Sequence, residues 1–121
     1  MKNEVKVEES QGIVEVVDHG VQTKEKLVAT GKKMRQAISG LRSKGLPVRI
    51  LVDVRDMKGQ TADSRSYVVD LFRSLDFDKA AVFGASVFIK QIIKFLLYIL
   101  NMKRKVQYFD NEKEAKDWLT G

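Results

Sequence analysis

The 121-residue chain contains no cysteine and only one proline, one histidine and one tryptophan. The absence of cysteine excludes disulfides, thiolate metal sites, iron–sulfur clusters and cysteine nucleophiles. With His19 as the only histidine, a multi-histidine metal site is excluded, and a Ser-His-Asp triad would depend on this residue alone. His19 stands between Asp18 and Gly20 at the end of a predicted strand, so we interpret it as a solvated turn histidine.

The eight glycines are scattered along the chain and form no phosphate-binding loop. Neither a Walker sequence, nor a dinucleotide fingerprint, nor a His-Glu-x-x-His motif is present. The sequence therefore predicts no catalytic residue, no cofactor and no metal, and it favours a binding protein over an enzyme.

Long hydrophobic runs are also missing. The most apolar stretch, 87–100, is interrupted by Lys90, Gln91 and Lys94 and is shorter than the roughly 20 residues that span a bilayer. The first six residues lack the apolar core of a secretory signal. We therefore expect a soluble protein of the reducing cytoplasm.

Basic residues outnumber acidic ones by 22 to 16, which gives a formal net charge of +6. Lysine and arginine are spread over the whole chain, with a denser group at 103–105. Because they do not alternate with aromatic side chains, which make up 8% of the chain, a nucleic acid is not expected as partner.

Apolar residues recur with alternating strand and helix periods. The order of predicted elements is two strands, which form a hairpin, followed by four helices that alternate with three more strands. The nearly continuous apolar run 48–54 is typical of a strand covered on both faces of a parallel sheet. The predicted strands are 6–9, 13–17, 48–54, 80–84 and 106–109, and the predicted helices begin near Thr23, Thr61, Ser86 and Glu112.

Three segments carry a resemblance to a known family: the second hairpin strand 12–16, the central strand 48–55, and the C-terminal region with 106–110 and 114–119. The chain resembles the SpoIIAA-like fold of the STAS superfamily, and in particular its uncharacterised branch described alongside Sec14-type lipid-binding domains. The resemblance implies one α/β domain over residues 1–121. It further implies a five-stranded mixed sheet, mainly parallel, with an N-terminal β-hairpin and four helices, and a protein-interaction or small-ligand module.

Anti-sigma factor antagonists of this family carry a phosphorylatable serine in an Asp-Ser-Ser-Gly-like turn. Here Asp63 and Ser64 match two positions of that turn, and the glycine is missing. Ser64 is therefore either a phosphorylation site or an ordinary residue of the first helical turn. If it is the latter, Asp63 serves as a partner of the helix dipole.

A candidate polar site follows the central strand, where Asp53, Asp56, Asp63 and Ser64 lie close in sequence. Ligands of open α/β sheets bind at the carboxyl ends of strands, and carboxylates are ligands of Mg²⁺. The alternative, which we favour, is that these side chains accept backbone hydrogen bonds in a loop and hold no metal.

The helix predicted over 87–102 is more apolar than one sheet requires. Its polar residues fall within an arc of about 100°, and apolar residues occupy about 220°. Three interpretations remain open: burial within the chain, a surface for another subunit or an apolar ligand, and contact with an anionic membrane surface. The residues predicted to bind the partner or ligand are Phe88, Ile92, Phe95, Leu96 and Ile99.

The sequence thus predicts a non-catalytic interaction or regulatory module that self-associates, as a dimer, or binds another protein through helix 87–102. The alternative is a carrier or sensor of an apolar, lipid-like ligand, with the same helix as a lid. Peripheral membrane contact is the least favoured of the three.

Overall fold

Five strands form one sheet whose spatial order follows the chain, β1-β2-β3-β4-β5. In the computed structural model, which describes residues 1–121, β1 and β2 are antiparallel and every other neighbouring pair is parallel. A short 3-10 turn, Glu9–Gln11, connects the first two strands. The strands are β1 (Glu4–Glu8), β2 (Ile13–Gln22), β3 (Arg49–Gln60), β4 (Lys79–Phe83) and β5 (Val106–Phe109).

Four helices follow β2, β3, β4 and β5 in turn: α1 (Lys24–Ser43), α2 (Ala62–Ser74), α3 (Val87–Leu100) and α4 (Glu112–Thr120). Polar caps fix three of their starts, because Thr23, Ser86 and Asn111 each accept a hydrogen bond from a backbone N–H in the first turn. Asn101 ends α3 in the left-handed conformation, with φ of 54°. No helix combines the length and the apolar composition needed to cross a bilayer.

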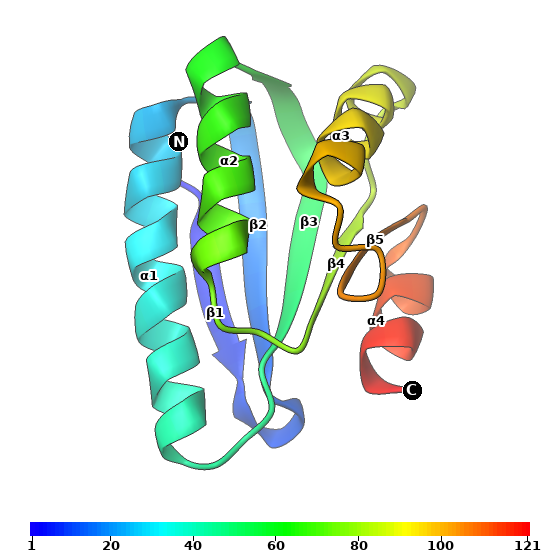
Figure 1. The fold of residues 1–121 in the computed structure, drawn as a ribbon. Helices are drawn as coiled ribbons and strands as arrows, with labels where there is room; N and C mark the ends of the chain where they lie inside the picture. Colours follow the sequence, from blue (N-terminus) through cyan, green and yellow to red (C-terminus); the bar gives the residue numbers. More distant parts are fainter.

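The helices are distributed unequally over the two faces of the sheet (Figure 1). Each of α1, α2 and α3 connects two parallel strands, and the strands advance in one direction across the sheet. Because such crossovers are right-handed, the three helices lie on one face. They cover a cluster of 21 buried apolar residues, whereas α4 covers a second cluster of six on the opposite face. That second cluster is Ile13, Leu51, Ala81, Phe83, Ala115 and Leu119.

The predicted fold is confirmed: the element order and the mixed, mainly parallel sheet are those expected from the sequence. The lengths of β2 and β3 differ from the prediction, because β2 runs to Gln22 and β3 to Gln60. These extensions pair with each other, through Gly20 opposite Met57 and Gln22 opposite Gln60. The segment predicted as a polar loop after Asp53 is therefore part of a strand.

Gly12 joins β1 to β2 where the backbone passes the end of α1. Its φ is +63°, and a Cβ atom at this position would lie 2.3 Å from the carbonyl oxygen of Pro47. The carbonyl oxygen of Gly12 accepts a hydrogen bond of 2.8 Å from Arg49 N at the start of β3. Only glycine allows both the left-handed conformation and this close approach.

Candidate functional site

An apolar stripe runs along the outer side of α3. The exposed fractions of Phe88, Phe95 and Ile99 are 73%, 61% and 41%, and Ile92 between them is half-buried. At 100° per residue these four positions fall within a narrow arc, so they form one continuous line, which we call the α3 stripe. No element of the chain covers it.

Four other apolar residues of α3 face the core, whereas Val87 and Tyr98 are also exposed. Leu96, which was predicted to contact a partner, is buried with Ile89, Ile93 and Leu100. Leu96 therefore lies outside the exposed surface of α3, in the same core as Phe72 and Val82, and its role in binding stays a prediction. The excess of apolar residues is therefore divided between the core and the α3 stripe.

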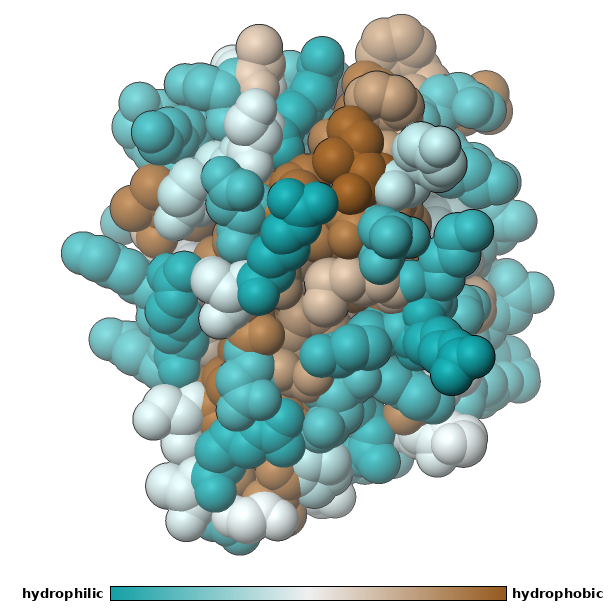
Figure 2. Space-filling view, viewed as in Figure 1, coloured by the Kyte–Doolittle hydropathy of each residue, from teal (hydrophilic) through white to brown (hydrophobic).

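The surface reflects this division. Figure 2 shows hydrophobic residues gathered at the upper right, over α3 and its border with α2, while hydrophilic residues cover most of the rest of the view. At this border Arg73 of α2 donates a hydrogen bond of 3.0 Å to the carbonyl oxygen of Ile99.

A cavity of about 90 Å³ lies beneath the same helix, between the sheet and helices α1, α2 and α3. Sixteen of its 19 lining residues are hydrophobic, among them Ile93, Leu96 and Leu97 of α3. The three polar residues that line it are Asp18, Thr30 and Gln60. Helix α3 therefore separates this cavity from the α3 stripe.

Asp18 is the most unusual residue of the cavity wall. Only 6% of its surface is exposed, and burial raises the pKa of its carboxyl group to about 7, despite an opposing contribution from Lys26. Its carboxylate accepts no hydrogen bond from the chain. A buried acid without a partner is unfavourable for folding, which makes Asp18 a functional candidate.

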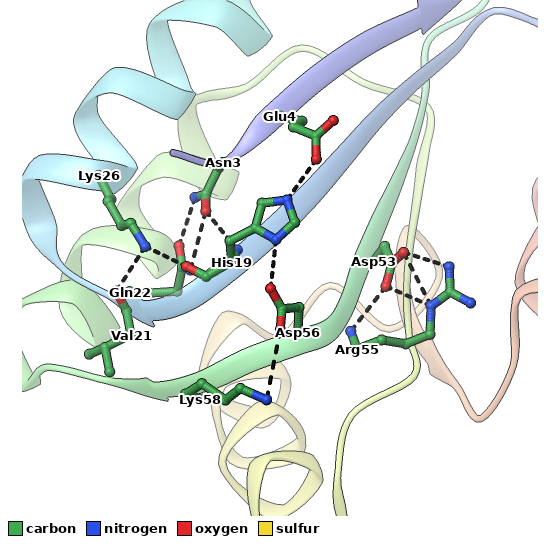
Figure 3. A network of polar contacts seen from close by, with 10 residues as sticks. All are labelled: Asn3, Glu4, His19, Val21, Gln22, Lys26, Asp53, Arg55, Asp56 and Lys58. Atoms are coloured by element: carbon green, nitrogen blue, oxygen red, sulfur yellow. Dashed lines mark hydrogen bonds and ion pairs between the residues drawn. The ribbon is translucent and has the colours of Figure 1, made fainter. Parts of the chain in front are cut away.

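The predicted polar residues do not form one site, and Figure 3 shows Asp53 and Asp56 with different partners. Asp53 is buried near α4 and accepts hydrogen bonds from the backbone and guanidinium of Arg55, at 3.0 and 2.8 Å. Burial alone would raise the pKa of Asp53, but these bonds outweigh it and hold the pKa below its usual range. Asp56 lies apart, beside His19, and Asp63 stands at the start of α2.

Ser64 is completely buried, and its hydroxyl donates a hydrogen bond of 2.8 Å to the carbonyl oxygen of Thr61. Phosphorylation of Ser64 stays a prediction, and it would require this buried hydroxyl to become exposed. Asp63 is exposed and accepts a hydrogen bond of 2.6 Å from the Thr61 hydroxyl. The chain has no group of three or more histidine or acidic side chains arranged to hold a metal ion.

His19 is bound between two carboxylates rather than exposed in a turn. Its Nδ1 lies 2.7 Å from Asp56 on β3, and its Nε2 lies 2.6 Å from Glu4 on β1 (Figure 3). Two such contacts need two ring N–H donors, so the geometry favours the imidazolium form. Accordingly, hydrogen bonds to Asp56 and Glu4 raise the pKa of His19, and those from His19 lower the pKa of both carboxyl groups.

The stabilisation from His19 is therefore expected to be largest near pH 5 to 6.5. Above this window it is lost as the pH rises through the raised pKa of His19, and below it as the carboxylates take up protons. In urea titrations, the stability difference between the wild type and His19→Gln should be largest near pH 6 and smaller at pH 9. A difference that does not change with pH would contradict the ion-pair interpretation.

Sequence reasoning missed Asp18 because β2 was expected to end at Val17. With the full strand, Asp18 follows the inward positions Val14 and Val16, so it occupies a place where the alternation demands an apolar side chain. Gln60 was missed for the same reason, since it lies in the unpredicted extension of β3.

The family model described as SpoIIAA-like matches residues 13–120. The chain belongs to the SpoIIAA-like family. Among solved structures, an uncharacterised protein from Shewanella loihica with a SpoIIAA-like fold matches with a TM-score of 0.69 and 17% identity, over 98% of this chain and 94% of that one. The anti-sigma factor antagonist SpoIIAA in its unphosphorylated form matches with a TM-score of 0.67 and 13% identity, over 98% of both chains. No curated protein sequence matches.

The site of this SpoIIAA-like chain thus has two adjoining parts. The α3 stripe is an uncovered apolar surface, and the cavity on the inner side of α3 contains an unpartnered acid. At these levels of identity the solved structures show the shared fold alone, so the function rests on these two features.

Proposed function

We propose that this SpoIIAA-like chain is a non-catalytic interaction module that binds another polypeptide through the α3 stripe. The observation that carries the proposal is the exposure of Phe88, Phe95 and Ile99 along one line of a helix. Exposed apolar patches of this kind mark interaction sites. The antagonist SpoIIAA, a protein of the same fold, is by its name a protein that opposes an anti-sigma factor, which agrees with a role exerted on a protein.

The spacing within the stripe indicates that the partner is a helix. Positions 88, 92, 95 and 99 are separated by four, three and four residues, which is the spacing of the seam between two packed helices. A second copy of the chain offers a matching helix. In an antiparallel pair around a two-fold axis, Phe88 of one copy would lie opposite Ile99 of the other, and Ile92 opposite Phe95. We therefore propose a symmetric dimer through α3.

The dimer is tested by placing a charge on each side of α3. Phe95→Glu should yield a folded monomer, because the charge faces water in the monomer and is buried in the dimer. Leu96→Glu should unfold the chain, because it buries an unpaired charge in the core. Sedimentation equilibrium gives the mass of each variant, and circular dichroism reports whether it is folded.

Gln36→Glu is the matched control, since it adds the same charge at an exposed position of α1. It should leave the mass unchanged. A wild type that is monomeric at all concentrations contradicts the dimer, and the same stripe would then be tested with a helical peptide partner.

The cavity favours a second candidate function, the carrying of a small apolar ligand. Ile93, Leu96 and Leu97 line the cavity from α3, so this helix would act as the lid. A volume of about 90 Å³ is below the roughly 150 Å³ of cavities that bind benzene, so a whole lipid would require α3 to move. Native mass spectrometry of freshly purified protein distinguishes the candidates, because it reports subunit number and any carried adduct.

A further inference from the structure

The wall of the cavity includes an acidic residue and no basic one. It contains no lysine, arginine or histidine, and its only polar residues are Asp18, Thr30 and Gln60. A ligand with an anionic head, such as a carboxylate or a phosphate, would therefore find no positive charge there. It would also meet the charge of Asp18 in an apolar surrounding, where repulsion is strong.

The three polar residues offer hydrogen-bond acceptors, and neither the ionised Asp18 nor the Thr30 hydroxyl has a free hydrogen to donate. The ionised carboxylate of Asp18 is an acceptor only. The Thr30 hydroxyl already donates its hydrogen to the carbonyl oxygen of Lys26, at 2.7 Å. The Oε1 atom of Gln60 is buried and has no hydrogen-bond partner. The Asp18 carboxylate and Gln60 Oε1 thus receive no hydrogen bond from the chain, and a ligand can supply the missing donors.

We propose that the cavity binds a small molecule with a protonated amine on a compact apolar body, and that Asp18 holds the amine. The inference rests on the second candidate function, the carrying of an apolar ligand, and names the chemical class of that ligand. The ammonium group supplies donors and a positive charge to Asp18, and the apolar body fills the space lined by residues such as Val54 and Leu71.

The choice of Asp18 follows from its burial. No group of the chain donates a hydrogen bond to its carboxylate, and burial raises its pKa to about 7 despite the opposing charge of Lys26. An ammonium group restores the interactions that burial removes, because a charge-assisted hydrogen bond is strong where water is excluded. The bound amine should accordingly favour the ionised carboxylate.

The test uses three six-carbon probes, n-hexylamine, n-hexanol and hexanoate, and a shorter amine, n-butylamine, at pH 8. Binding to the full chain is measured by isothermal titration calorimetry, and the variants are Asp18→Asn and Asp63→Asn. Asp63 is an exposed carboxylate at the start of α2, so its variant controls for general attraction of amines to acidic groups.

Saturable binding of both amines and no binding of hexanoate are the expected results, and hexylamine, which is larger than the cavity of about 90 Å³, requires α3 to move. Asp18→Asn should weaken hexylamine binding at least tenfold and leave hexanol binding unchanged, and Asp63→Asn should change neither. A ¹³C spectrum of the aspartate carboxyl groups adds a direct reading, since the Asp18 signal should move to its ionised position when hexylamine is added.

Three outcomes would overturn the proposal. Equal binding of hexylamine and hexanol, with no effect of Asp18→Asn, would leave a plain apolar site and preserve the second candidate function without the amine. Tighter binding of hexanoate than of hexylamine would show that the cavity prefers an anionic ligand to a cationic one. Binding of none of the probes would remove both the amine and the carrier function, while the α3 stripe would be unaffected.

Discussion

Asp18→Asn is expected to stabilise the folded chain at pH 8 and to change its stability little below pH 4. In the unfolded chain the carboxyl group titrates near its ordinary pKa of 3.8, whereas in the folded chain its pKa is about 7. Between these values the unfolded state is ionised and the folded state is protonated. The wild type therefore loses roughly 1.4 kcal/mol of unfolding free energy per pH unit as the pH rises from 4 to 7.

The total effect is on the order of 4 kcal/mol, the product of a shift from 3.8 to about 7 and the free energy of one pKa unit. Asparagine has the shape of the neutral acid and does not ionise, so the variant should lack this loss. Urea unfolding at pH 4, 6 and 8 measures the difference. His19 also makes stability fall with rising pH, but this contribution is common to both proteins.

The control is Asp63→Asn, which removes an exposed carboxylate and should change the stability at pH 8 much less than Asp18→Asn does. Wild type and Asp18→Asn profiles that run parallel from pH 4 to pH 8 would show that Asp18 is ionised in the folded chain, with a partner the structure does not contain.

Gly12→Ala is expected to destabilise the folded chain strongly. The left-handed conformation costs an alanine about 1–2 kcal/mol, and relieving a contact with the Pro47 carbonyl adds about 1–3 kcal/mol. The contact is severe, because the Cβ atom would lie 2.3 Å from a backbone oxygen that cannot rotate away. Thermal and urea unfolding should therefore show a loss of roughly 2–5 kcal/mol, a large part of the 5–15 kcal/mol typical of a domain.

Gly40→Ala is its matched control. Gly40 lies within α1, where an added Cβ atom meets nothing within 4 Å. Alanine should stabilise this helix by about 0.5–1 kcal/mol. Equal effects of the two substitutions would show that Gly12 is not constrained by Pro47.

The order of helices and strands could be predicted because each element carries its own local signal. The apolar run 48–54 indicates a buried strand, and Thr23, Ser86 and Asn111 are residue types that begin helices. The ends of β2 and β3 carry no such signal. They contain His19, Gly20, Lys58 and Gly59, which form a strand only because the two extensions pair with each other. Such pairing is a tertiary effect and is not visible in either segment alone.

The candidate site was predictable in part for the same reason. Helical spacing identified α3 as too apolar for one sheet, but it did not decide which of its apolar sides faces the core. That side depends on the angle at which α3 leaves β4, and the structure places Leu96 inward and Phe95 outward. The role of Asp18 could not be predicted, because its inward orientation follows only if β2 extends beyond Val17. A charged residue at an inward position is informative only when the strand is known to include it.

The position of α4 has a consequence for the growing polypeptide. Leu51, Ala81 and Phe83 are synthesised well before Ala115 and Leu119, which cover them on the opposite face of the sheet. At 5–20 residues per second, the ribosome takes roughly two to seven seconds to proceed from Phe83 to Leu119. During this interval the face of the sheet that α4 later covers is bare. If translation stops in this interval, the apolar side chains that α4 later covers are exposed, and a chaperone could bind the nascent chain at these strands.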